Sequence, residues 1–228
     1  MPFRYDQFCP IARAGEILGS RWTLLILREL FLGPQRFTDL REHLAGVSTS
    51  VLAERLRYLE DQGLVASRPL PPPAATSVYE LAPDGRAFWP AFREIAVWGA
   101  RFMARGREDG DHFEPDWVRL AALCFAATRE TPALTIGFRV VQAGRRPDLV
   151  FRVSGGPAGA RVDLVEEPNH AVVRGQPEAL LGVIAGAIDP TAGAVELLGD
   201  PAAARRAASL FDLDLAGPES QDSPASVH

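Results

Sequence analysis

The sequence predicts an α+β fold in two domains, a mainly helical one followed by one that is rich in strands. Between Trp22 and Gly63, three short segments with one apolar face are separated by sharp turns, whereas the later half holds several segments in which apolar and polar residues alternate. The stretch Arg105–Pro115 between them is acidic and contains glycine, which is typical of a linker. With 228 residues available for two cores, we expect domains at 1–107 and 108–215 and a disordered tail at 216–228.

The first two segments predict a pair of helices joined by a tight turn. The first helix begins near Trp22 and stops at Gly33-Pro34. Its apolar residues have the one-sided spacing of a buried helix, at Leu24, Leu25, Leu27, Phe31 and Leu32. The second helix is brief, with Thr38 as a candidate N-cap and Gly46 at its end. A short helix of this kind is typical of a helix-turn-helix.

The third segment predicts a helix with one apolar and one polar face. Ser48 offers an N-cap hydroxyl, and Leu52, Leu56 and Leu59 recur on the side that can pack against the preceding helices. At roughly 100° per residue, the opposite face holds Ser50, Glu54, Arg57 and Asp61. Together with Ser48 and Thr49 at its start, this face has the hydroxyls and arginine that contact base edges or phosphates in a major groove.

A wing between two strands is expected after Gly63. LVASRP and VYEL can each form a strand, and the run from Leu70 to Ser77 between them is rich in proline and alanine. Pro71, Pro72 and Pro73 cannot donate ladder hydrogen bonds, so this loop should project beyond the sheet.

The chain up to about Phe102 resembles the HxlR family of bacterial winged-helix transcription regulators, which is related to the MarR type. The matching blocks are CPIARAGEILGSRW, RELFLGPQRFTDLR, GVSTSVLAERLRYLEDQGLV and VYELAPDGRAFWPAFREIAVWGA. The resemblance implies a homodimer that reads a two-fold DNA operator with the Ser48–Gln62 helix and touches the flanking backbone with the wing. Family members often carry a basic residue near the start of that helix and another in the wing, where this chain has Ser50 and Thr76.

The predicted DNA-contacting residues come from the helix-turn-helix and the wing. They are Arg36, Ser48, Thr49, Ser50, Glu54, Arg55, Arg57, Arg68 and Thr76. For each arginine the alternative is a solvated surface residue. Arg55 lies nearer the leucine stripe, so an ion pair with Glu54, Asp61 or a neighbouring helix is a further alternative for it.

The charge of the two halves agrees with DNA binding in the first. Residues 1–107 hold 14 arginines against 11 acids, a net charge of +3, whereas residues 108–228 have a net charge of −8. A net charge of +3 is modest, so attraction to phosphates has to come from the local placement of arginines. The chain has no lysine, which excludes a phosphate-loop lysine and a Schiff base.

A helix from about Asp84 to Ala104, bent at Pro90, is expected to form the dimer interface. Its apolar and small residues repeat at intervals of four and three: Phe88, Phe92, Ile95, Gly99 and Phe102. Trp89 and Trp98 add apolar surface on neighbouring faces. The alternative is a stripe that packs inside its own domain.

The two cysteines have different surroundings. Cys9 precedes Pro10 and the first helix, where several HxlR-type regulators place a redox-sensing thiol, and nearby arginines or the helix start can lower a thiol pKa. The alternative is a small buried residue at a helix junction. Cys124 lies in the apolar run LAALCFAA and is expected in a core. Two cysteines without a signal peptide predict a cytoplasmic protein.

The second half is expected to form an α+β layer. A helix is expected at DWVRLAALCFAATRE, followed by strands at LTIGFRVV, DLVFRVS, ARVDLVE and HAVVRG. Apolar and polar residues alternate along these strands, which predicts a sheet with one face exposed to solvent. A helix with Pro177 in its first turn follows, and Asp200-Pro201 opens a last helix through about Leu210.

This half resembles the sterol-carrier-protein-like domain, notably in NHAVVRGQPEALLGVIAGAIDPTAGAVELLGDPAAARRAASLF. The resemblance implies an apolar tunnel for a fatty or sterol-like ligand. Candidate lining residues are Ile136, Phe138, Phe151, Leu180, Ile184 and Leu210. The alternative is that these residues fill an ordinary core.

No catalytic or metal-binding pattern stands out, and no apolar run is long enough to cross a bilayer, so we expect neither an enzyme nor a metal or cofactor. The leading hypothesis is a dimeric DNA-binding regulator, expected to be a repressor, whose second domain senses an apolar small molecule. The alternative is a lipid carrier or oligomerisation protein with vestigial DNA binding.

Overall fold

The computed structural model describes residues 4–74, 76–105, 110–142, 144, 147–166 and 171–213. They form two compact units that divide between Pro90 and Ala91, ahead of the boundary expected at residue 107. The division falls there because the following helix packs within the second unit: the guanidinium of Arg93 donates to the carbonyl of Ala126 at 3.4 Å, and Phe92 is buried. The expected tail at 216–228 lies outside the described residues.

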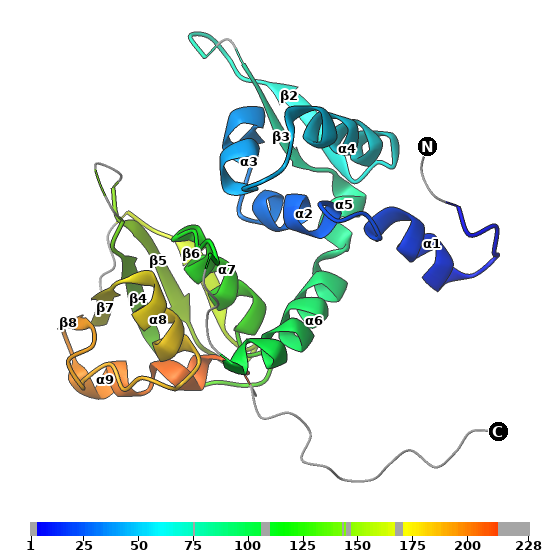
Figure 1. The fold of residues 1–228 in the computed structure, drawn as a ribbon. Coiled ribbons are helices and arrows are strands. Elements are labelled where there is room, and N and C mark those ends of the chain that lie inside the picture. Colours follow the sequence, from blue (N-terminus) through cyan, green and yellow to red (C-terminus); the bar gives the residue numbers. More distant parts are fainter. Residues whose placement is uncertain are drawn as a thin grey trace, which may run out of the picture. The chain divides into compact units, whose positions relative to one another are not determined.

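The first unit contains the predicted helix-turn-helix and its wing (Figure 1). Its elements are α1 (Pro10–Leu18), α2 (Thr23–Phe31), β1 (Gln35–Arg36), α3 (Phe37–His43), α4 (Thr49–Asp61), β2 (Val65–Pro69), β3 (Ser77–Leu81) and α5 (Pro83–Ala87). The strands form an antiparallel sheet in the order β1-β3-β2, with Val65 opposite Leu81 at the inner end of the wing and Pro69 opposite Ser77 at the outer end.

The core of this unit lies between the three helices and the base of the sheet. The leucine stripe of α4 is fully buried, as predicted, and contacts apolar residues of α2, α3, β2 and β3. The buried face of α2 agrees only in part with the predicted one. Leu27 and Leu32 are buried as predicted. Ile26 and Leu30 are buried as well, whereas Leu24 and Leu25 are only half-buried. The two faces are neighbouring sectors of one helix, and tertiary packing selects between them.

The helix ends in this unit are set by hydrogen bonds from side chains to the main chain and by the backbone conformation of glycine. Ser48 caps α4 as predicted, since its hydroxyl accepts from the main-chain N–H of Val51 at 3.3 Å. Thr38 is not the cap of α3; the helix begins one residue earlier, and the carboxylate of Asp39 accepts from the N–H of Arg36 at 3.0 Å. Gly33 has a φ of 139°, which only glycine adopts readily and which allows the chain to turn after α2.

The single helix expected from Asp84 to Ala104 is interrupted. The structure has α5, then α6 (Trp89–Ala100), then the 3₁₀ turn η1 (Arg101–Arg105), with a break at Phe88. Proline lacks an N–H and clashes with the carbonyl four residues earlier, so a continuous helix through Pro90 is disfavoured. Beginning a new helix at Trp89 places Pro90 in the first turn, where neither problem arises.

The second unit is an α+β layer, as predicted (Figure 1). After α6 and η1 it contains α7 (Asp116–Phe125), β4 (Thr135–Val140), β5 (Leu149–Ser154), β6 (Arg161–Leu164), β7 (Ala171–Gly175), α8 (Pro177–Ile184), β8 (Glu196–Leu198), α9 (Pro201–Arg205) and η2 (Ala207–Leu210). The sheet order is β6-β5-β4-β7-β8, with β4 and β7 parallel and the other pairs antiparallel. Apolar residues of α7, α8, α9 and η2 pack on the inward residues of this sheet.

Candidate nucleic-acid interface

The polar face of α4 is open to solvent. Ser50, Glu54, Arg57 and Asp61 are all exposed, opposite the buried leucine stripe. At the start of the helix Ser48 and Thr49 are exposed too, and the hydroxyls of Ser48 and Ser50 lie 3.2 Å apart. The structure therefore brings the predicted reading residues of α4 to one exposed face, except Arg55.

Arg55 packs against neighbouring side chains and is not fully exposed to solvent. It is half-buried, its guanidinium lies 5.1 Å from the centre of the Tyr58 ring, and its buried Nε has no hydrogen-bond acceptor among the described residues. The Tyr58 hydroxyl in turn donates to the main-chain carbonyl of Glu16 in α1 at 3.3 Å. This flank of α4 is thus occupied by packing against α1.

Arg57 lies on the exposed face and is partly held by its own helix. Its Nε donates to the carbonyl of Ala53, one turn earlier, at 3.3 Å. This contact directs the guanidinium along the helix surface. A guanidinium has further N–H donors that can reach a phosphate or a guanine edge.

The wing carries one predicted arginine and a carboxylate beside it. Arg68 on β2 donates through Nε to Glu80 on β3 at 3.3 Å, and both side chains are partly exposed. Glu80 therefore offsets the positive charge that Arg68 would offer to a phosphate. Thr76 is exposed, and its carbonyl accepts from the N–H of Leu70 at 2.9 Å, which closes the loop.

Two exposed residues near this surface were not predicted. Val51, in the first turn of α4, is 40% exposed, and an apolar side chain at this end of the helix suits the methyl group of thymine. Arg41 is exposed on α3, as Arg36 is just before that helix. Periodicity alone assigns Val51 to neither the leucine stripe nor the polar face. The sequence feature that could have indicated a DNA contact is its position in the first turn after the cap Ser48.

The predicted dimer residues differ in their exposure to solvent. Phe92 is buried and Phe88 packs against the core of the first unit, whereas Ile95, Trp98 and Phe102 are exposed by 37%, 61% and 66%. The rings of Trp98 and Phe102 meet edge to face with their centres 4.9 Å apart. Gly99 is half-buried, and a Cβ there would meet no atom within 4 Å. The apolar surface of α6 and η1 is thus centred on Trp98.

The cysteines differ as expected in burial. Cys9 is half-buried at the N-cap position of α1, and Cys124 is buried in α7. Burial raises the pKa of the Cys124 thiol to about 12, although the positive charge of Arg93 lowers it somewhat. Cys124 is therefore an un-ionised core residue.

The six candidate pocket residues of the second unit belong to one packed core. Ile136, Phe138, Phe151, Leu180, Ile184 and Leu210 are all almost completely inaccessible to solvent. The rings of Phe138 and Phe151 stack at 5.1 Å with an interplanar angle of 7°. In this arrangement they fill the space between sheet and helices.

Two further findings concern the described residues alone. No three His, Cys, Asp or Glu side chains among them are grouped so that they could hold a metal ion. Among the same residues, no helix combines the length and apolar character needed to span a membrane.

Comparison with known proteins identifies relatives of the N-terminal part of the chain, through α6 and η1. The sequence model of HxlR-like helix-turn-helix proteins matches residues 17–107. The chain is 35% identical over 102 residues to the HTH-type transcriptional regulator YodB of Bacillus subtilis, covering 44% of this chain and 91% of YodB. It is 36% identical over 96 residues to the uncharacterized HTH-type transcriptional regulator YtfH of Escherichia coli, covering 41% of this chain and 75% of YtfH. Among solved structures, the reduced form of YodB is 34% identical, covers 44% of this chain and all of that chain, and has a TM-score of 0.39.

Proposed function

Since this chain belongs to the HxlR-like helix-turn-helix family, whose named relatives are transcriptional regulators, we propose that it binds a two-fold DNA operator as a homodimer and represses transcription. The observation that carries this proposal is the exposed polar face of α4, opposite a fully buried leucine stripe. A helix fixed in this way can enter a major groove without losing its own core contacts.

The base contacts are proposed to come from the first two turns of α4. Ser50 and Thr49 offer hydroxyls that serve either base edge, and Val51 offers an apolar surface. Glu54 is an acceptor, so it suits the amino group of cytosine and disfavours approach to a phosphate. Specificity on this face would therefore come both from favourable contacts with the correct bases and from repulsion between Glu54 and a wrongly placed phosphate.

The phosphate contacts are proposed to come from Arg36, Arg57 and Arg68. If each met one phosphate in each protomer, about six counterions would be released on binding, and operator affinity would fall steeply as salt rises. The pairing of Arg68 with Glu80 reduces its share of this attraction. Exposed Arg41 on α3 is a further candidate for a backbone contact.

Dimerisation is proposed to use the exposed apolar surface of Ile95, Trp98 and Phe102. Large exposed aromatic side chains that contact each other are typical of the centre of a protein interface. A dimer carries two α4 helices, one for each half-site of a two-fold operator.

The second unit is proposed to modulate DNA binding by accepting an apolar molecule. Its mixed sheet with helices packed on the inward residues supports this, together with the resemblance to sterol-carrier domains. Because the candidate lining residues are closely packed, such a ligand has to displace core contacts and would favour an opened state. Cys9 is proposed as a second input, since a half-buried thiol at the start of α1 is accessible to small oxidants.

Operator binding by the full chain tests the proposal. Fluorescence anisotropy would compare a labelled duplex from the region upstream of the chain's own gene with a scrambled duplex, over a series of salt concentrations. We expect tighter binding to the former, a stoichiometry of two chains per site and a steep loss with salt. Equal, weak binding to both duplexes would favour the alternative of a carrier or oligomerisation protein.

A further inference from the structure

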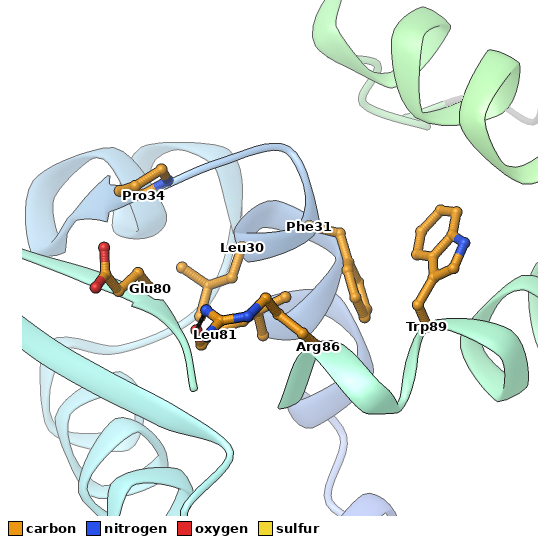
Figure 2. Close-up of a pocket in the computed structure, with 7 residues that line it drawn as sticks. All are labelled: Leu30, Phe31, Pro34, Glu80, Leu81, Arg86 and Trp89. Carbon is orange, nitrogen blue, oxygen red and sulfur yellow. Dashed lines mark hydrogen bonds between the residues drawn. The ribbon is translucent and has the colours of Figure 1, made fainter. Parts of the chain in front are cut away.

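The first unit contains a pocket of about 370 Å³ on the side of α2 where β3 and α5 meet it (Figure 2). Its lining residues are Leu30, Phe31, Pro34, Glu80, Leu81, Arg86 and Trp89. All seven belong to the first compact unit, and none is among the residues proposed to read bases. The pocket is therefore separate from both the polar face of α4 and the core of the second unit.

The pocket offers an aromatic and aliphatic surface. The side chains of Phe31 and Trp89 face each other in Figure 2. They meet edge to face, with ring centres 4.9 Å apart and an interplanar angle of 64°. Leu30 and Leu81 are buried beside them. Flat apolar groups are well matched to such a surface, because aromatic rings prefer edge-to-face or offset contacts with other rings.

The pocket also carries one positive charge that no carboxylate in the described residues neutralises by an ion pair. The guanidinium of Arg86 is held by a hydrogen bond to the carbonyl of Leu81, and its other N–H groups remain available. The carboxylate of Glu80 is engaged by Arg68 on the neighbouring strand. Arg86 is therefore the charged residue of the pocket that has no ion-pair partner among the described residues. A guanidinium can bind a carboxylate through two parallel hydrogen bonds.

We propose that this pocket is a binding site for a small aromatic carboxylate, with the carboxylate on Arg86 and the ring against Phe31 and Trp89. The volume is near the lower end for small-molecule pockets, so a ligand of one or two fused rings is expected. Trp89 is the first residue of α6, so the ligand would contact both the body of the winged helix and the helix that carries the proposed dimer surface.

Binding to the full chain is measured by isothermal titration calorimetry with 2-naphthoate. Two control compounds separate the sources of affinity: 2-naphthamide keeps the rings without the charge, and octanoate keeps the charge on a fatty chain. We expect 2-naphthoate to bind at least about tenfold more tightly than either, because a charge-assisted hydrogen bond and ring contacts each contribute. No binding of 2-naphthoate at millimolar concentrations would overturn the proposal.

Variants locate the site. Arg86→Gln keeps a donor for the Leu81 carbonyl but loses the charge, and it should weaken 2-naphthoate binding about tenfold, with part of the loss restored in Arg86→Lys. Trp89→Leu should weaken binding as well. The matched control is Arg21→Gln, which removes an exposed arginine of the same unit and should leave binding unchanged.

Three results would overturn the proposal: equal binding to Arg86→Gln and the parent chain, equal binding of 2-naphthamide, or tighter binding of octanoate. The last result would place the ligand in an apolar core such as that of the second unit. A circular-dichroism melt of each variant checks folding, and Arg86→Met, which also removes the charge, serves in place of Arg86→Gln should the latter unfold. Because no DNA is present, the outcome is independent of whether the chain binds an operator.

Discussion

The carboxylate of Glu29 in α2 lies 3.0 Å from Nδ1 of His43 in α3, and its side chain is only 1% exposed. Nε of Arg28 lies 2.8 Å from the other oxygen of the same carboxylate. A carboxylate taken out of water at this depth has to be compensated by such partners. The pair therefore ties together the two helices that position α4.

Glu29→Gln should destabilise the first unit strongly. The amide keeps the size of the side chain but leaves the partly buried guanidinium of Arg28 without its counter-charge, and breaking a buried pair in this way costs about 3–5 kcal/mol of unfolding free energy. Urea denaturation followed by circular dichroism measures the change. The control is Glu94→Gln, which removes the exposed partner of Arg93 and should change stability by about 0.5 kcal/mol or less. Equal effects of the two variants would contradict the structural role of Glu29.

Arg57→Ala should mainly weaken operator binding, whereas Arg55→Ala should mainly lower stability. Arg57 is exposed on the proposed reading face, so its removal should weaken operator binding by about 1–3 kcal/mol with little effect on stability. Arg55 packs on Tyr58, so its removal should lower the melting temperature more than Arg57→Ala does. Operator anisotropy and thermal melts on both variants give the comparison. Unchanged affinity of Arg57→Ala would remove this residue from the reading surface.

Glu80→Gln should strengthen DNA binding. The substitution releases Arg68 from its carboxylate partner at 3.3 Å, so one more cation per protomer can approach a phosphate. Affinity should rise, and the slope of log affinity against log salt should steepen by up to about one per protomer. The double variant Arg68→Gln/Glu80→Gln is the control and should show no gain over Arg68→Gln. A gain in the double variant would mean that Glu80 repels DNA directly.

Trp98→Glu should convert the proposed dimer to a monomer. Trp98 is the most central large side chain of the exposed surface on α6 and η1, and a charge there is incompatible with an apolar interface. Sedimentation velocity reports the mass. Glu94→Gln on the same helix again serves as the control and should stay dimeric. A dimeric Trp98→Glu variant would place the interface elsewhere.

Alkylation should distinguish the two cysteines. At pH 7.5 iodoacetamide should modify Cys9 in the folded chain and leave Cys124 intact, because a thiol with a pKa of about 12 holds almost no thiolate. Peptide mass spectrometry reads the sites, and urea should expose Cys124. The folded thiol keeps its proton above the ordinary pKa of 9.0 while the unfolded one loses it, so this group reduces stability as pH rises from 9 to 12. Cys124→Ala should remove that part of the alkaline loss.

The sequence predicted the features that depend on neighbouring residues. The cap at Ser48, the leucine stripe of α4 and the strands β2 to β7 follow from local hydrogen bonding and from periods of 3.6 and 2 residues, and all are present. The short edge strands β1 and β8 were not predicted, because two or three residues show no clear alternation. The order of the second sheet, with β4 beside β7, is not encoded in any single segment.

Features that depend on distant residues were missed. Glu29 and His43 are 14 residues apart, and the pocket joins residues from Leu30 to Trp89, so no local pattern reveals either. The sequence predicts an apolar stripe on α6, but its spacing does not indicate which of these apolar residues are buried inside the unit and which are exposed. Packing against the rest of the unit separated buried Phe92 from exposed Trp98.

The hydrogen bond from Tyr58 to the carbonyl of Glu16 joins the N-terminal helix to α4, and its strength limits the change in DNA affinity that this one bond can transmit. A single neutral hydrogen bond contributes about 0.5–1.5 kcal/mol, which corresponds to a factor of about two to thirteen in an equilibrium constant. A signal that reaches α4 through this bond alone, such as oxidation of Cys9 at the start of α1, can therefore change operator affinity by at most about one order of magnitude. A regulator that needs a larger response has to move its two reading helices relative to each other as well.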